Sequence, residues 1–188
     1  MIELERPPVV LVADPPWMFD DDLPGDGRGA AKHYPCMSLA ELMAMEIPVR
    51  LEEPNAVLFL WRVHAMQREA LDLAEHWGFT VKSELVWRKM ARKAAWLEFF
   101  GLGRYVRAAH EVCLIATRGQ AAPECRSIRS IFSARVRAHS QKPEAFYQIV
   151  ECLYPRSPKF ELFARTIRPG WVQHGNQLGA LPLERLAA

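Results

Sequence analysis

The sequence predicts an α/β fold built on a largely parallel β-sheet. Short apolar runs alternate along the 188-residue chain with stretches in which apolar residues recur at helical spacing. The first run, Val9 to Ala13, is apolar throughout, as expected for a strand that is covered on both faces. Strands that alternate with helices in this way are typical of parallel sheets with helices packed on their faces.

The first predicted strand stops at Asp14-Pro15-Pro16-Trp17, because each proline fixes φ and removes a backbone donor. An acid at the end of such a strand lies where open α/β sheets bind their ligands. The following residues, 18–33, are rich in Asp and Gly and predict a loop. Such a loop is either a lid over the site or a plain connector.

The later elements follow from capping, periodicity and breaker residues. Ser38 and Glu41 match the reciprocal capping pattern, so a helix is expected to begin at Ser38 and to end before Pro48. Residues 120–137 are expected to be irregular and basic. The remaining predictions are strands over 56–61, 79–87, 111–117, 159–165 and 170–173, and helices over 64–77 and 143–153.

Length and composition favour one domain over residues 1–188. Half of the residues are hydrophobic and 24% are charged, which is ordinary for a soluble globular chain. No apolar run approaches the roughly 20 residues that span a membrane. The first residues lack the pattern of a secretion signal. We therefore expect a cytoplasmic protein with no membrane partner.

Cysteine and histidine spacing predicts no metal centre. The four cysteines, Cys36, Cys113, Cys125 and Cys152, are scattered without a C-x-x-C pair. They are expected to be free thiols, with a disulfide or a zinc site as the less favoured alternative. His110-Glu111 lacks the second histidine, four residues on, that a metalloprotease helix requires.

The charges are distributed unevenly. Residues 1–80 contain 14 acidic and 6 basic residues, whereas residues 81–188 contain 8 acidic and 18 basic residues. A basic half favours a polyanionic partner, first of all nucleic acid, over the alternative of a solvated face with internal ion pairs.

The segment from Arg88 to Arg107 interleaves cations with aromatic residues. This pattern suits a nucleic-acid surface, because cations attract phosphates and rings stack on bases. The alternative is an amphipathic helix whose rings pack inward. On the first interpretation Arg88, Lys89, Arg104 and Arg107 are assigned to substrate binding.

Several motifs occur together and in a fixed order. They are Asp14-Pro15-Pro16-Trp17, Leu102-Gly103-Arg104-Tyr105, His110-Glu111, Thr117-Arg118-Gly119, His139-Ser140-Gln141-Lys142-Pro143, Glu161-Leu162-Phe163-Ala164-Arg165, Gly170-Trp171 and Gly175-Asn176-Gln177. In this combination the chain resembles the N6-adenine methyltransferases typified by the catalytic subunit of the eukaryotic mRNA adenosine methyltransferase, in a compact bacterial or phage form. The resemblance extends from about Val9 to Leu178.

The resemblance implies a Rossmann-like fold that uses S-adenosylmethionine, in permuted order, with the catalytic motif first and the cofactor strands last. It implies methylation of adenine N6 in DNA. RNA as the substrate, a non-catalytic nucleic-acid-binding subunit and a small-molecule methyltransferase are the alternatives. DNA is preferred because the chain is minimal and carries no appended RNA-binding module. Compact members look like prophage or restriction–modification enzymes, and a homodimer is left open.

The resemblance also assigns roles to residues. The carboxylate of Asp14 and the carbonyl of Pro15 would accept the two hydrogens of the adenine amino group, with Pro16 stiffening the motif and Trp17 stacking on the base. On the cofactor side, Asp14 would lie beside the methyl donor. Lys142 would bind its methionyl carboxylate, Arg165 and Asn176 its ribose, and Phe163 and Gln177 its adenine.

Tyr34 and Ser140 are assigned to the substrate side. The chain departs from many bacterial members at Gln177, where these have Glu, so the contact of this residue is the least defined.

Overall fold

The computed structural model describes residues 7–18, 36–47, 53–94, 96–101, 105–137, 141–175 and 178. The strands in this part of the chain are β1 (Val9–Ala13), β2 (Ala56–Arg62), β3 (Thr80–Met90), β4 (His110–Arg118), β5 (Ile131–Arg135), β6 (Lys159–Leu162) and β7 (Val172–His174). The helices are α1 (Leu39–Met43), the 3₁₀ turn η2 (His64–Met66), α2 (Gln67–His76) and α3 (Glu144–Leu153).

The strands form one sheet in the order β5-β3-β4-β2-β1-β6-β7. β1 lies parallel to β2 and β6, β6 is parallel to β7, and β3 is parallel to β5. β4 is antiparallel to both of its neighbours, β2 and β3. The predicted α/β class with a largely parallel sheet is confirmed. The permuted strand order stays a prediction.

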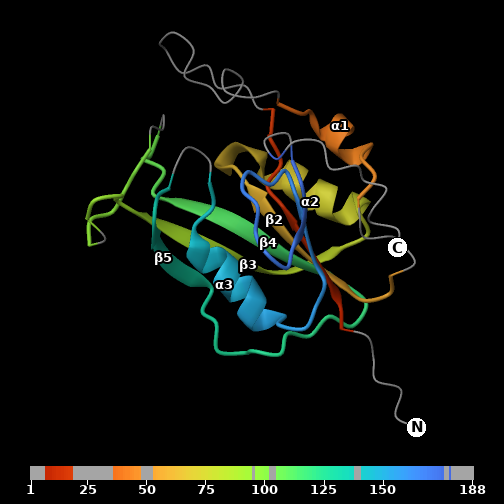
Figure 1. Cartoon of the computed structure of the whole chain (residues 1–188). Helices are drawn as coiled ribbons and strands as arrows, with labels where there is room; N and C mark the ends of the chain where they lie inside the picture. Colours follow the sequence, from red (N-terminus) through yellow and green to blue (C-terminus); the bar gives the residue numbers. More distant parts are fainter. Residues whose placement is uncertain are drawn as a thin grey trace.

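Helices cover both faces of the sheet, with α1 and α2 on one side and α3 on the other (Figure 1). Alternate residues of the central strands supply the two cores. Leu11 and Leu58 pack on the side of Leu73 from α2. Val12 and Phe59 pack on the opposite side, where Phe146 belongs to α3. Burial on both faces explains the continuous apolar runs of β1 and β2.

The predicted helix signals are confirmed in α1 and α2. Ser38 caps α1, and its side chain and that of Glu41 make the reciprocal hydrogen bonds of the capping box. α1 ends at Met43, well before Pro48. α2 is followed by Gly78, whose φ of 79° is a left-handed conformation that glycine adopts without strain.

Two predictions of secondary structure are wrong, and so is the alternative of an amphipathic helix over 88–107. Residues 120–137 contain the strand β5, which was expected to be irregular. β6 ends at Leu162 rather than Arg165, because Phe163 has a φ of 63° and leaves the extended conformation. The described residues of 91–109, here called the arm, form no helix and extend away from the sheet between β3 and β4 (Figure 1).

Two further findings concern the described residues alone. No helix among them combines the length and the apolar character that a membrane span requires. All four cysteines are free thiols, as expected.

Candidate active site

Several strands bring functional side chains to one edge of the sheet, here called the Asp14 edge. β1, β2 and β6 are parallel, so their carboxyl ends meet there, and Asp14 directly follows β1. Because β4 is antiparallel to β2, its first residues, including Glu111, lie at the same edge. β3 reaches this edge with its last residues, where Trp87 pairs with Glu111 and Lys89 follows.

Four charged side chains of alternating sign are linked at this edge. The ammonium of Lys142 lies 2.9 Å from Asp14 Oδ1 and 2.9 Å from Glu111 Oε2. The ammonium of Lys89 lies 2.7 Å from Glu111 Oε1. Lys142, whose side chain is only 11% exposed, also lies 4.9 Å from the centre of the Trp61 ring. We call Lys89, Glu111, Lys142 and Asp14 the charged chain.

The pKa values follow from burial set against these charges. Burial outweighs the nearby Lys142 and leaves the pKa of Asp14 above its ordinary value of 3.8. Burial also acts to raise the pKa of Glu111, but Lys142 and Lys89 outweigh it and lower the pKa to about 2. Burial acts to lower the pKa of Lys142, and the two carboxylates reverse this, so its pKa is raised. Lys142 and Glu111 are therefore charged at neutral pH.

A small cavity of about 10 Å³ adjoins Asp14, with room for about one water molecule. Glu161, on β6, is buried at its wall and accepts hydrogen bonds from the Tyr147 hydroxyl (2.7 Å) and from Nε2 of Gln173 (2.6 Å). Burial raises the pKa of Glu161. The lining residues are Asp14, Gln141, Lys142, Tyr147, Glu161, Phe163, Arg165 and Thr166.

The chemistry of this lining fits an amino acid linked to a nucleoside, as in S-adenosylmethionine. The Lys142 ammonium suits a carboxylate, and the Asp14 and Glu161 carboxylates suit an ammonium or ribose hydroxyls. The Phe163 ring suits an aromatic base. Such a molecule is far larger than this cavity.

Beside this cavity, the residues that follow β6 and β7 lie in close contact with each other. A Cβ atom on Gly175 would lie 2.1 Å from the carbonyl oxygen of Ala164, so only glycine fits there. Gly175 leads directly to Asn176 and Gln177, which lie outside the described residues together with Tyr34, Arg104 and Ser140. Their predicted roles stay predictions.

The structure places Trp17 in the core rather than at the surface. Its ring is 3% exposed, and its indole N–H donates to the carbonyl of Trp61 at 3.0 Å. The carbonyl of Pro15 accepts from the Trp17 backbone N–H at 2.9 Å, and that of Pro16 accepts from Met37 at 2.8 Å. The turn of the motif is therefore held by backbone hydrogen bonds within it and from Met37. Base stacking by Trp17 stays a prediction.

The cations assigned to substrate binding differ in their surroundings. Arg88 is exposed and pairs with Glu98 at 2.9 Å, whereas Lys89 is part of the charged chain. The guanidinium of the exposed Arg107 lies 5.7 Å from the centre of the Phe100 ring. On the arm, Trp96 is 81% exposed and Tyr105 is 98% exposed, so these rings do not pack inward.

Sequence reasoning missed Glu111 and Glu161 as site residues. Both are acids that directly precede apolar residues of a strand, and a buried acid in a strand requires a partner. That signal was present in the sequence. Their partners, Lys142 and Tyr147, are distant along the chain and could not be assigned to them from spacing.

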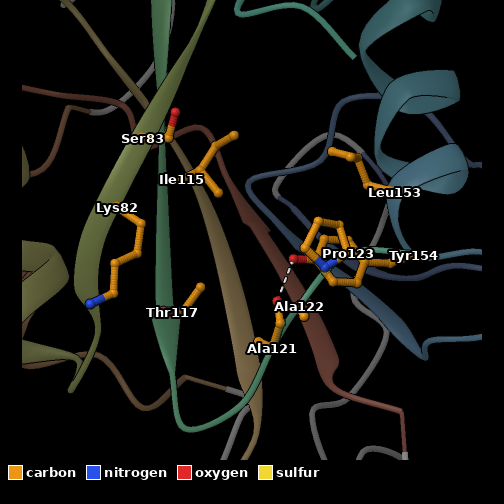
Figure 2. A pocket seen from close by; sticks show the side chains of 9 residues that line it. All are labelled: Lys82, Ser83, Ile115, Thr117, Ala121, Ala122, Pro123, Leu153 and Tyr154. Carbon is orange, nitrogen blue, oxygen red and sulfur yellow. Dashed lines mark hydrogen bonds between the residues drawn. The ribbon is translucent and has the colours of Figure 1, made fainter. Parts of the chain in front are cut away.

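Figure 2 shows a larger cavity, of about 400 Å³, whose lining includes no residue of the charged chain. It includes Lys82 near the start of β3 and Thr117 near the end of β4, so it lies toward the opposite edge of the sheet. The other lining residues are Ser83, Ile115, Ala121, Ala122, Pro123, Leu153 and Tyr154.

The chain is similar to known methyltransferases over nearly its whole length. The MT-A70 family model matches residues 8–177. The N(6)-adenosine-methyltransferase MT-A70-like protein of Drosophila melanogaster is 31% identical over 177 residues, which are 93% of this chain and 27% of that protein. The human N(6)-adenosine-methyltransferase catalytic subunit METTL3 is 30% identical, over 93% of this chain and 29% of that protein.

A relative of more similar length is the type II methyltransferase M.MunI of a Mycoplasma species. It is 27% identical over 188 aligned residues, which cover 90% of this chain and 77% of that protein. The chain thus spans less than a third of the two eukaryotic relatives and most of this one. With the family model matching the strands that form the Asp14 edge, the chain belongs to the MT-A70 family of methyltransferases.

Proposed function

We propose that this protein transfers the methyl group of S-adenosylmethionine to N6 of adenine in DNA. Membership of a family that includes N(6)-adenosine-methyltransferases supports the class of reaction. The observation that carries the assignment of the site is the position of Asp14. Its carboxylate lies at the end of β1, beside Lys142 and a cavity whose lining suits the methyl donor.

Methyl transfer to adenine N6 requires a well-oriented nucleophile more than a strong base. The lone pair of the adenine amino nitrogen is delocalised into the ring, so the nitrogen is a poor nucleophile. The Asp14 carboxylate accepts one amino hydrogen and the Pro15 carbonyl accepts the other, which aligns the nitrogen and favours a pyramidal geometry. The Pro15 oxygen already accepts from Trp17, and a carbonyl has a second lone pair for this contact.

The negative charge of Asp14 also favours the positive charge that grows on the nitrogen during transfer. S-adenosylmethionine, when bound, supplies a methyl group on a positively charged sulfonium. Lys142 would hold its carboxylate. Among the described residues, carboxylates take two of the three N–H donors of Lys142, so one donor is left for the ligand.

The arm and the cations beside it would receive the nucleic acid. Arg88 and Arg107 are exposed near the Asp14 edge, and the exposed rings of Trp96 and Tyr105 offer stacking faces for bases. A base in a duplex must leave the stack to reach Asp14, at a cost of a few kcal/mol. Contacts of this kind with the displaced strand would offset part of that cost.

DNA is proposed over RNA because the relative of similar length is a type II methyltransferase, a class associated with DNA modification. RNA is the second candidate, because the relatives at 30–31% identity are adenosine methyltransferases. A side-by-side assay separates them: labelled S-adenosylmethionine with single-stranded DNA, duplex DNA and RNA, followed by nucleoside analysis. We expect label in N6-methyldeoxyadenosine. Label in N6-methyladenosine alone would assign the substrate to RNA, and no label in either would contradict both.

Substitution of Asp14 tests the site itself. Asp14→Asn keeps the shape but removes the charge, so transfer should fall by at least about a hundredfold. S-adenosylmethionine should still bind, as measured by calorimetry, because Lys142 remains. The matched control is Asp72→Asn on α2, which should retain wild-type turnover. Wild-type turnover in the Asp14 variant would show that this carboxylate is not catalytic.

A further inference from the structure

Two of the free cysteines lie together on the surface, away from the charged chain. Cys125 belongs to the connector between β4 and β5, and Cys152 lies in the last turn of α3. Cys152 is exposed and Cys125 is half-buried. Their side chains lie close enough for each thiol to shift the pKa of the other, although 26 residues separate them in the chain.

Backbone and side-chain contacts hold together the two segments that carry this pair. The N–H of Glu124 donates to the carbonyl of Leu153 at 2.9 Å, so the residues that precede Cys125 and follow Cys152 are bonded directly. The ion pair of Arg156 with Glu124, at 3.2 Å, joins the same two segments. Tyr154 adds a hydrogen bond from its hydroxyl to the carbonyl of Ala121, at 2.7 Å (Figure 2).

The two sulfur atoms have different surroundings. Cys125 Sγ lies 3.2 Å from Ser127 Oγ, and the backbone of Ser127 and Ile128 also acts to lower the pKa of Cys125. Such surroundings favour the thiolate form of Cys125 and lower its pKa. The pKa of Cys152, in contrast, is raised by the nearby Cys125. A half-buried thiol whose thiolate form is favoured, beside an exposed second thiol, matches the arrangement of a redox-reactive cysteine with its resolving partner.

We propose that Cys125 and Cys152 form a reversible redox site, in which a hydroperoxide oxidises Cys125 and Cys152 then closes an intramolecular disulfide. The Cys125 thiolate attacks one peroxide oxygen, and the O–O bond breaks. The leaving hydroxide takes a proton to become water, and Cys125 becomes a sulfenic acid. The Cys152 sulfur then attacks the Cys125 sulfur, the S–O bond breaks, and a second water leaves with the thiol proton.

The two thiols thus supply two electrons, and one hydrogen peroxide becomes two water molecules. A dithiol reductant reverses the reaction by thiol–disulfide exchange. The new bond would tie the β4–β5 connector covalently to the end of α3, beside the cavity of about 400 Å³ that both segments line. It would add to the hydrogen bonds and the ion pair that already join these segments.

Peptide mapping by mass spectrometry tests the site on the full reduced chain. After treatment with equimolar hydrogen peroxide, the protein should lose two hydrogen atoms. Trypsin places Cys125 in peptide 119–126 and Cys152 in peptide 138–156, so the disulfide joins two peptides that are otherwise separate. A dithiol should release them again, and dilution of the protein should not change the yield.

Single substitutions to serine distinguish the two sulfurs. In Cys152→Ser, a sulfenic acid should accumulate on Cys125 and be trapped by a 1,3-dicarbonyl reagent. In Cys125→Ser, no linked peptide should form, and Cys36→Ser is the matched control that should behave as wild type. A linked pair that includes Cys36 or Cys113, a yield that falls with dilution, or no linked peptide at all would overturn the proposal. These readouts are independent of methyl transfer.

Discussion

The charged chain shows how one lysine lets two carboxylates occupy the Asp14 edge together. Either acid alone would resist ionisation there, since burial acts to raise the pKa of both Asp14 and Glu111. The ammonium of Lys142 lies between them at 2.9 Å from each. Lys89 is a second cation 2.7 Å from Glu111, and the two lysines lower the pKa of Glu111, whereas burial outweighs Lys142 and Arg165 at Asp14. The charged form of Asp14, the proposed catalytic acid, is thus the less strongly stabilised of the two.

Glu111→Gln should therefore reduce stability in a pH-dependent way. At pH 7 the change leaves Lys89 without its carboxylate partner and should lower the free energy of unfolding by about 2 kcal/mol. The folded pKa of about 2 lies below the ordinary value of 4.5, so this stability is complete above about pH 4.5. It is lost as the pH falls toward about 2. Urea unfolding of both proteins across this range measures the difference.

Glu75→Gln on α2 is the matched control, because Glu75 is exposed and lies on another element. It should change the free energy of unfolding by less than about 0.5 kcal/mol at every pH. A difference between Glu111→Gln and wild type that stays constant down to pH 3 would contradict the assigned ion pairs.

Individual site residues differed in how far the sequence could predict them. Asp14 and Lys142 lie in recognisable motifs, and the structure brings their side chains together. Glu111 lies in a quoted motif as well, but its partnership with Lys142 depends on the antiparallel course of β4. The buried indole N–H of Trp17 donates to the carbonyl of Trp61, 44 residues away, and no local pattern reveals this partner.

Strands and helices could be predicted where their burial produces a recognisable pattern of apolar residues. β1 and β2 are buried almost throughout, and their apolar runs were recognised. β5 has no fully buried residue, since its side chains alternate between exposed and half-buried, and it exists by pairing with the edge of β3. Pairing of this kind is a long-range event that short-range sequence patterns do not record.

Gly119 directly follows β4, and the close approach of the Pro54 backbone to Gly119 fixes where this strand ends. Its φ is 63°, and a Cβ atom would lie 1.9 Å from the carbonyl oxygen of Pro54. Gly119→Ala should therefore lower the free energy of unfolding by about 3 kcal/mol, through backbone strain and a steric clash together. Gly170→Ala is the matched control, because its φ is 79° but no atom of the described residues lies within 4 Å of the added Cβ.

The control should lose only about 1 kcal/mol, the cost of the left-handed conformation alone. Thermal unfolding followed by circular dichroism compares the two variants. Equal losses would show that the chain around Pro54 moves aside at little cost, and that the close approach does not fix this boundary.

In the whole molecule, the acidic and basic halves of the sequence fold into a single sheet, and part of the charge is paired internally. Lys142 with Asp14 joins the two halves, while Arg168 with Glu151 lies within the second. The alternative of internal ion pairs therefore accounts for some of the basic excess. The cations that remain exposed near the Asp14 edge include Arg88 and Arg107, on either side of the exposed rings of the arm.

The salt dependence of DNA binding should distinguish these cations from the rest. Removal of one cation that binds a phosphate lowers the slope of log K against log salt by about 1. Arg107→Gln should show the full decrease, whereas Arg88→Gln should show less, because Glu98 already neutralises part of the Arg88 charge at 2.9 Å. Arg156→Gln, next to the Cys125–Cys152 pair and away from the arm, should leave the slope unchanged. Fluorescence anisotropy with a labelled oligonucleotide, from about 50 to about 200 mM salt, measures all three. Equal decreases in all three variants would mean that DNA binding depends only on the net charge of the basic half. The cations beside the arm would then have no specific role in binding.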